Sequence, residues 1–442
     1  MDRLPVELRQ MTLGNLDSVR ALRNAALSCK ILFNDLKDAE ELITGEVFVR
    51  QVGYDVLAEA LVVEESRSLG LPCIEKGKRF AEANFAQRKP APARWSLADA
   101  WPLAVFHEKV SYLARQAARE SLEKQPRLLA MGAPSSTELR RFERALYRFQ
   151  LYCNVVGRLP ALGHDELQDI FFAYFSNWEN EQLACIHEHL LRVISRPFNY
   201  LVDHDVGWGC LEIPYILVST SDYAQGIMVE GIETIYRLSR ASDYAQWHSL
   251  LSRGGVPLHE RVPGPACLAY GLRYGANRVG GEVTAAMLEQ DEGLRAYFYG
   301  REFYEDPDPG PASMWEWVNR ESFPDESVAN WNTAALRLWA FPFWDLARVE
   351  GAGLLGNPTI PAVYFWADSI FSPDPELDQY NTRAREEYLR ESRRERVIIG
   401  DAGGTGFYSP GDTSQIDWDS GTRWGAAYTD FWYRTSGRDE PL

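Results

Sequence analysis

The sequence predicts a mostly α-helical protein, with a small N-terminal helical module followed by a larger, predominantly helical domain. Apolar residues recur mainly three and four positions apart, as on one face of a helix, and strand-like alternation is scarce. The chain has 442 residues, of which 45% are hydrophobic and 25% are charged. A chain of this length can bury the cores of two or three domains without disulfides or metals.

The first predicted helix covers residues 4–16, with Pro5 in the first turn, where its missing N–H costs nothing. At about 100° per residue, Leu4, Leu8 and Met11 cluster on one side of this helix. Val6 and Leu13 point to the opposite side. The helix therefore has two apolar faces.

A second helix is predicted over residues 18–36, again with apolar residues on two sides. Its broad apolar arc consists of Leu22, Ala25, Ala26, Cys29, Leu32, Phe33 and Leu36. Leu27 and Ile31 lie behind this arc. A unit of about forty residues cannot bury that much apolar surface by itself. We expect the excess to meet either the following domain or another protein.

The larger domain contains three well-marked helical segments. Residues 102–123 carry a continuous apolar stripe, and Ser135 with Glu138 forms a capping-box pattern at the start of the next helix. Residues 165–196 are interpreted as two helices joined near Ser176.

At that junction Ser176 and Glu179 form a second capping-box pattern, and Pro197 is expected to end the second helix. Further helices are predicted over residues 224–240, 333–350 and 380–396. The last of these has interleaved charges and few apolar residues, so we expect it to face water.

Composition and chain breaks predict four parts. Residues 1–45 form the N-terminal module, and residues 46–95 form a helical connector that contains a proline-rich break at 88–92. Residues 96–396 form the helical domain, where we expect an interaction and substrate-recognition region. Residues 397–442 form an acidic segment containing glycine and aromatic residues.

The charge balance argues against two classes of partner. With 46 basic and 63 acidic side chains, the net charge is −17, which repels nucleic acid and anionic membrane surfaces. No stretch approaches the roughly 18 consecutive apolar residues of a membrane-spanning helix, and the opening residues do not resemble a secretory leader. The six cysteines form no C-x-x-C pair. We expect reduced thiols in a cytoplasmic or nuclear protein.

The N-terminal pattern resembles the F-box consensus. The matching residues are Leu4-Pro5-Val6-Glu7-Leu8, Met11, Leu16, Leu22, Leu27-Ser28-Cys29-Lys30 and Phe33. In that family the module is a small helical bundle that binds the Skp-type adaptor of a cullin-based ubiquitin ligase, and the rest of the chain selects the substrate. Residues 40–47 further resemble F-box-like proteins of filamentous fungi, which have long helical C-terminal regions.

By position, the resemblance assigns seven residues to the adaptor contact and the core beneath it. They are Leu4, Pro5, Leu8, Met11, Leu16, Leu22 and Phe33. Thr12 and Ala25 depart from the family pattern, in which larger aliphatic residues are more usual, and we expect the smaller contacts there to weaken adaptor binding. The resemblance implies a non-catalytic receptor subunit of a cullin-RING (SCF-type) ubiquitin ligase. Its protein substrate is not indicated by the sequence, and no cofactor is expected.

Two alternatives come from other classes of protein. The densest set of potential metal ligands is Cys185, His187, His189, Asp203, His204, Asp205 and Cys210. On a helix, His187 and His189 point about 160° apart, so no metal site is predicted from them. A helical enzyme with a His and carboxylate pocket near residues 187–205 is the first alternative. The second is a scaffold that uses the N-terminal module outside a ligase.

Overall fold

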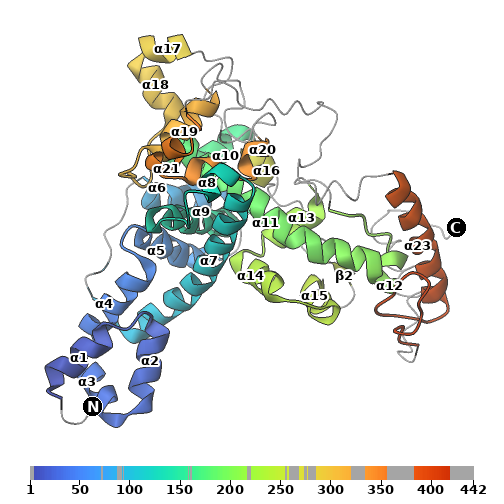
Figure 1. The fold of residues 1–442 in the computed structure, drawn as a ribbon, viewed down its shortest axis with the longest axis horizontal. Helices are drawn as coiled ribbons and strands as arrows, with labels where there is room; N and C mark the ends of the chain where they lie inside the picture. Colours follow the sequence, from blue (N-terminus) through green and yellow to red (C-terminus); the bar gives the residue numbers. More distant parts are fainter. Residues whose placement is uncertain are drawn as a thin grey trace. The chain divides into compact units, whose positions relative to one another are not determined.

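The computed structural model describes residues 4–70, 73–86, 92, 94–157, 159, 162–216, 221–253, 256–257, 268–272, 276, 285–319, 334–355 and 383–418 (Figure 1). Within these ranges the chain is mostly helical and contains one short pair of antiparallel strands, which confirms the predicted fold class. The chain divides into two compact units. Unit 1 comprises Met1–His189, Val229–Tyr236 and Pro263–Phe365, and unit 2 comprises Leu190–Met228, Arg237–Val262 and Trp366–Leu442.

Four helices open unit 1, and they are shown in blue in Figure 1. Their bounds are α1 (Val6–Gly14), α2 (Val19–Ser28), α3 (Lys30–Asp38) and α4 (Glu40–Val52). The helix predicted over residues 18–36 is therefore wrong as a single element, because the backbone of Cys29 is extended, with φ −151° and ψ 130°. The break restarts the helical phase at Lys30. The boundary predicted after residue 45 falls within α4.

The middle of unit 1 is built on two long helices, α7 (Leu97–Glu123) and α9 (Ser136–Val155). α7 begins earlier than predicted because the Ser96 hydroxyl accepts a hydrogen bond from the Asp99 N–H at 3.1 Å. The capping box at the start of α9 is confirmed. The Ser135 N–H donates to Glu138 Oε2 at 2.7 Å, and the Glu138 N–H donates to Ser135 Oγ at 3.1 Å.

The other elements that lie wholly in unit 1 are mostly short. They are α5 (Leu57–Ser66), η1 (Arg67–Leu69), α6 (Ile74–Asn84), α8 (Pro126–Leu129), α10 (His164–Ile170), η2 (Phe172–Tyr174), α16 (Leu268–Tyr270), α17 (Ala285–Gln290), α18 (Glu292–Tyr299), α19 (Gly310–Asn319), α20 (Ala334–Arg337), η6 (Phe341–Phe343) and α21 (Leu346–Gly351). α9 packs against α5, α7 and η6. At its contact with η6, the rings of Phe142 and Phe343 stack with their centroids 4.0 Å apart.

α11 (Asn177–His204) begins at the predicted junction but runs past the predicted stop. The Ser176 N–H donates to Glu179 Oε2 at 3.0 Å, and the Glu179 N–H donates to Ser176 Oγ at 3.3 Å. The expectation that Pro197 ends the helix is wrong. Proline inside a helix costs about 3 kcal/mol, and burial of Phe198 one residue further along offsets part of this cost.

Two other segments predicted as single helices are interrupted. Residues 224–240 form α13 (Asp222–Met228) and α14 (Ile232–Arg240), separated by Gly231 at φ +81°. Glycine adopts this left-handed conformation without steric cost, which allows a turn there. The segment predicted over residues 333–350 contains α20, η6 and α21 from residue 334 onward, with Ala340 at φ +50° just before η6, and residue 333 lies outside the described residues.

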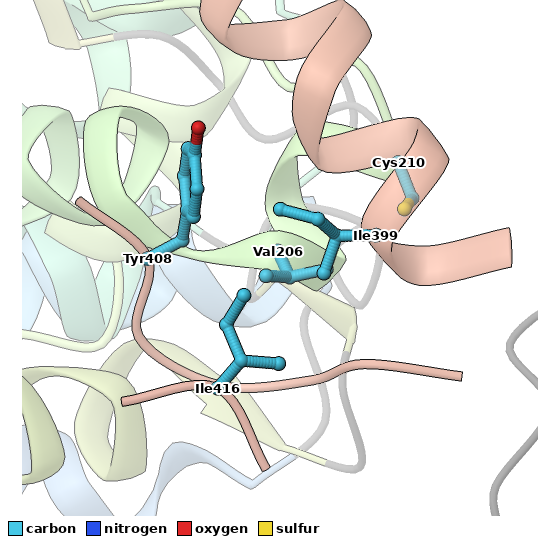
Figure 2. Close-up of a cluster of buried hydrophobic side chains, with 5 residues drawn as sticks. All are labelled: Val206, Cys210, Ile399, Tyr408 and Ile416. Carbon is cyan, nitrogen blue, oxygen red and sulfur yellow. The ribbon is translucent and has the colours of Figure 1, made fainter. Parts of the chain in front are cut away.

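Unit 2 contains α12 (Val206–Cys210), α15 (Tyr244–Leu251), β1 (Ser252–Arg253), β2 (Val256–Pro257) and α23 (Arg383–Asp401). After α23 the chain folds back, and the Tyr408 N–H donates to the His204 carbonyl at 2.6 Å. The resulting small core consists of Val206, Cys210, Ile399, Tyr408 and Ile416 (Figure 2).

The helix predicted to face water, now seen as α23, has one buried face. Arg396 is fully buried, and its Nη1 donates to the Asp205 carbonyl at 3.2 Å. Leu389 and Ile399 are buried with it. The interleaved charges in the sequence do not reveal this buried face, because a charged arginine can still pack its long aliphatic stem against apolar neighbours.

Candidate docking surface

The N-terminal bundle is anchored by a partly buried ion pair. Arg9 on α1 donates to both carboxylate oxygens of Asp35 on α3, at 2.6 and 2.9 Å. Gln10 Nε2 donates to the Asp35 carbonyl at 3.0 Å. The hydrogen bond from Arg9 lowers the pKa of Asp35 below its ordinary value. These contacts fix α1 on α3.

α2 is fixed in turn to α4 and α7. The Val19 N–H donates to Gln51 Oε1 at 2.9 Å, and Gln51 Nε2 donates to the Ala104 carbonyl at 3.2 Å. Arg20 forms an ion pair with Glu108 at 2.6 Å. The bundle is therefore held as a defined body at one end of unit 1, from which α4 and α7 lead away (Figure 1).

The N-terminal bundle carries five large apolar side chains that the described chain leaves about half exposed or more. On α1 and the residues before it, Leu4 is 42% exposed, Leu8 46% and Met11 61%. Phe33 on α3 is 47% exposed, and Leu27 near the end of α2 is 66% exposed. Single exposed apolar residues are common on proteins, but several on one small body are typical of an interaction site.

The structure separates the seven residues that the sequence assigned jointly to the adaptor contact and its core. Five are exposed, namely Leu4, Pro5, Leu8, Met11 and Phe33. Leu16 is half-buried, and Leu22 is completely buried. Leu22 is therefore a core residue, and the first five form the accessible set.

Sequence reasoning misplaced Phe33 and left Leu27 out of the contact set. Phe33 was expected on the same arc as Leu32 and Leu36, which are buried, but the break at Cys29 turns it outward. Helical spacing places Leu27 behind that arc, and this position is the sequence signal for its exposure. We name the exposed side chains of Leu4, Leu8, Met11, Leu27 and Phe33 the outer apolar surface.

The histidines considered for an enzyme pocket lie in different units. His187 and His189 are buried in unit 1, and His189 Nδ1 lies 3.3 Å from Glu120 Oε2. His204 lies in unit 2, where its Nδ1 is 3.0 Å from the Tyr408 carbonyl oxygen. Among the residues that the structure describes, no group of three or more His, Cys, Asp or Glu side chains is arranged to hold a metal ion.

The surroundings of His187 disfavour the charged form of its imidazole ring. Burial, followed by the positive charge of Arg337, lowers the pKa of His187 to about 3. Because this folded pKa is below the unfolded value, the folded state binds fewer protons. Above the unfolded pKa, His187 does not lower the free energy of unfolding. As the pH falls below that value, the free energy of unfolding decreases, because the unfolded state takes up the proton. Between about pH 6.5 and about pH 5.5, His187 is expected to reduce the free energy of unfolding by about 1 kcal/mol.

Chemical denaturation at the two pH values measures this loss. In the variant His187→Gln, which has no titrating group at this position, the loss between the two pH values is expected to be smaller by the same amount. An identical loss in the wild type and the variant would contradict the lowered pKa of His187.

Comparison with known proteins finds no match: no protein-family model fits the chain, and no curated protein or solved structure is similar to it. None of the described helices is both long and apolar enough to cross a membrane. What the residues themselves provide is a sequence motif and an anchored bundle that presents the outer apolar surface.

Proposed function

We propose that the chain is an F-box-like receptor subunit of a cullin-RING ubiquitin ligase. In this proposal the outer apolar surface binds a Skp-type adaptor, and the remaining helices bind a protein that is to be ubiquitinated. The observation that most supports the proposal is the exposure of Leu4, Leu8, Met11 and Phe33 on a bundle whose helices are fixed to one another and to α7 by hydrogen bonds and ion pairs. These are among the residues that the F-box resemblance assigns jointly to the adaptor contact and the core beneath it.

The outer apolar surface is large enough to matter energetically. Covering each half-exposed side chain contributes about 1 kcal/mol, so five such side chains contribute about 5 kcal/mol. A micromolar complex requires about 8 kcal/mol. Polar contacts around the surface therefore have to supply the remainder, as they do in most protein interfaces.

A protein partner suits this surface better than a lipid partner. The net charge of −17 opposes approach to an anionic membrane, and five apolar side chains alone are too few to overcome that repulsion. The anchored bundle instead offers a preformed shape, which reduces the entropy lost when a folded partner binds. In this role the chain contributes recognition, and the transfer of ubiquitin takes place on other subunits.

Capture of the full chain by an immobilised Skp-type adaptor tests the proposal. Leu8→Asp places a charge in the surface and is expected to reduce capture at least about tenfold, because the carboxylate loses its hydration on binding. Leu129→Asp is the matched control, since Leu129 on α8 is 48% exposed and Leu8 is 46% exposed. This control is expected to be captured like the wild type.

Two outcomes would overturn the ligase assignment. If the adaptor captures neither the wild type nor the variants, the outer apolar surface does not bind it. If the wild type binds the adaptor but never joins a complex that contains the cullin, the module acts in a scaffold outside a ligase.

A further inference from the structure

Unit 1 contains a cavity of about 320 Å³. It lies between the end of α6, the short helix η2 and the segment that joins α18 to α19. Its lining includes three aromatic residues and three charged ones: Phe85, Tyr174, Phe303, Arg301, Glu302 and Glu305. This volume is at the lower end of the range for small-ligand sites and fits one long side chain.

One wall of the cavity is held rigidly by hydrogen bonds. The Phe303 N–H donates to Glu179 Oε2 at 2.9 Å, and Trp178 Nε1 donates to Glu302 Oε1 at 2.7 Å. The Asp306 N–H donates to Glu302 Oε2 at 3.3 Å. Because these bonds already fix the segment, little ordering remains to be done when a ligand enters.

The charges at the cavity favour a cation. Arg301 and Glu305 are exposed, have opposite signs and form no ion pair with any residue in the described part of the chain, so their effects largely cancel in water. Glu302 is half-buried. Burial, followed by the negative charge of Glu179, raises the pKa of Glu302 above its ordinary value. Buried Arg148 lies 3.8 Å from Glu179 and balances part of this negative charge, and a positive group in the cavity would lie beside Glu302 itself.

Aromatic rings beside a carboxylate form a recognised kind of site for positive groups, because the faces of the rings are electron-rich. We propose that this cavity binds the alkylammonium or guanidinium group of a lysine or arginine side chain within a polypeptide. Glu302 supplies the charge, and Tyr174 with Phe303 supplies aromatic surface around the aliphatic stem. The polypeptide source rests on the proposed receptor function, whereas affinity for the cationic group does not.

Nuclear magnetic resonance titration of the full chain with small probes tests the proposal. The basic probes are N-acetyl-lysine N-methylamide and N-acetyl-arginine N-methylamide, and N-acetyl-norleucine N-methylamide is their neutral counterpart. We expect the basic probes to bind at least about fivefold more tightly than the neutral one. Putrescine, a free amine without a backbone, is expected to bind no more tightly than the capped lysine.

Three variants locate the binding. Glu302→Gln is expected to weaken binding of the basic probes at least about fivefold and to leave the norleucine probe unchanged. Tyr174→Leu removes an aromatic ring without touching Glu302 and is expected to weaken the basic probes about threefold. Glu350→Gln makes the same change in charge at an exposed position outside the cavity and is expected to bind like the wild type.

Equal binding of the lysine and norleucine probes, or unchanged binding in both Glu302→Gln and Tyr174→Leu, would overturn the cation site. Putrescine binding at least about tenfold tighter than the capped lysine would overturn the polypeptide source. Glu302→Gln is expected to be captured by the adaptor like the wild type. Normal capture without probe binding therefore refutes the cavity alone, and probe binding without capture refutes the receptor function alone.

Discussion

Replacing Leu22 with aspartate is expected to reduce the free energy of unfolding by about 4 kcal/mol or more, whereas Leu8→Asp changes it by less than about 0.5 kcal/mol. Leu22 is completely buried in α2, which packs against α3, α4 and α7. A carboxylate there has no partner and loses its hydration. Leu8 is 46% exposed, so the carboxylate introduced by Leu8→Asp stays in water in the free protein.

Chemical denaturation followed by circular dichroism compares the two variants with the wild type. The contrast separates the two roles that the F-box resemblance assigned together to both leucines. A loss of several kcal/mol in Leu8→Asp would show that Leu8 supports the fold, and reduced adaptor capture by that variant would then say nothing about a docking surface.

A second large effect is expected from Arg141→Ala. Arg141 on α9 is completely buried, and its guanidinium donates to Asp306 Oδ2 at 2.8 Å and Oδ1 at 3.0 Å. It also donates to Asp345 Oδ1 at 2.8 Å and to the Phe343 carbonyl at 2.9 Å. Removing the arginine takes the counter-ion from Asp345 and leaves Asp306 with Arg144, whose Nη2 donates to Asp306 Oδ2 at 2.9 Å. The free energy of unfolding should fall by about 3–5 kcal/mol.

The control for this substitution is Arg119→Ala. Arg119 is 71% exposed and lies 3.9 Å from Glu123, so the loss of this pair is expected to cost less than about 0.5 kcal/mol. Urea denaturation of the two variants measures the difference. Comparable losses in both would contradict the importance of the buried network for joining α9 to the segments around residues 306 and 345.

The same network makes a prediction about acid. Burial acts to raise the pKa of Asp306, but the hydrogen bond and charge of Arg141 outweigh it and hold that pKa below its ordinary value. The stabilising effect is therefore present above the unfolded pKa of the aspartate and is lost as the pH falls through the folded value. In Arg141→Ala the pKa of Asp306 rises towards its unfolded value, so the acid-dependent loss of stability should become smaller than in the wild type.

Local hydrogen bonding explains which helix starts the sequence could predict. Ser135 with Glu138, and Ser176 with Glu179, satisfy each other's backbone N–H groups within four residues. Such a pattern needs no tertiary contact and is visible in the sequence. Past Pro197, the ring of Phe198 on α11 packs against the rings of Trp208 and Tyr223, and no local pattern in the sequence reports these contacts.

The docking surface was partly predictable for a related reason. Leu8 and Met11 lie on one face of a regular helix, so their common direction follows from spacing alone. The direction of Phe33 depends on the extended backbone at Cys29, which breaks the periodicity. The cavity was not predictable, because Phe85, Tyr174 and Phe303 are brought together only by the fold.

Isothermal titration calorimetry of the full chain with a purified Skp-type adaptor, at several temperatures, measures the central claim most directly. We expect one-to-one binding with a dissociation constant of about 1 μM or tighter. The heat-capacity change should be negative, because apolar surface leaves water when the outer apolar surface is covered. No binding at about 100 μM of each protein, or equal binding by Leu8→Asp, would contradict it.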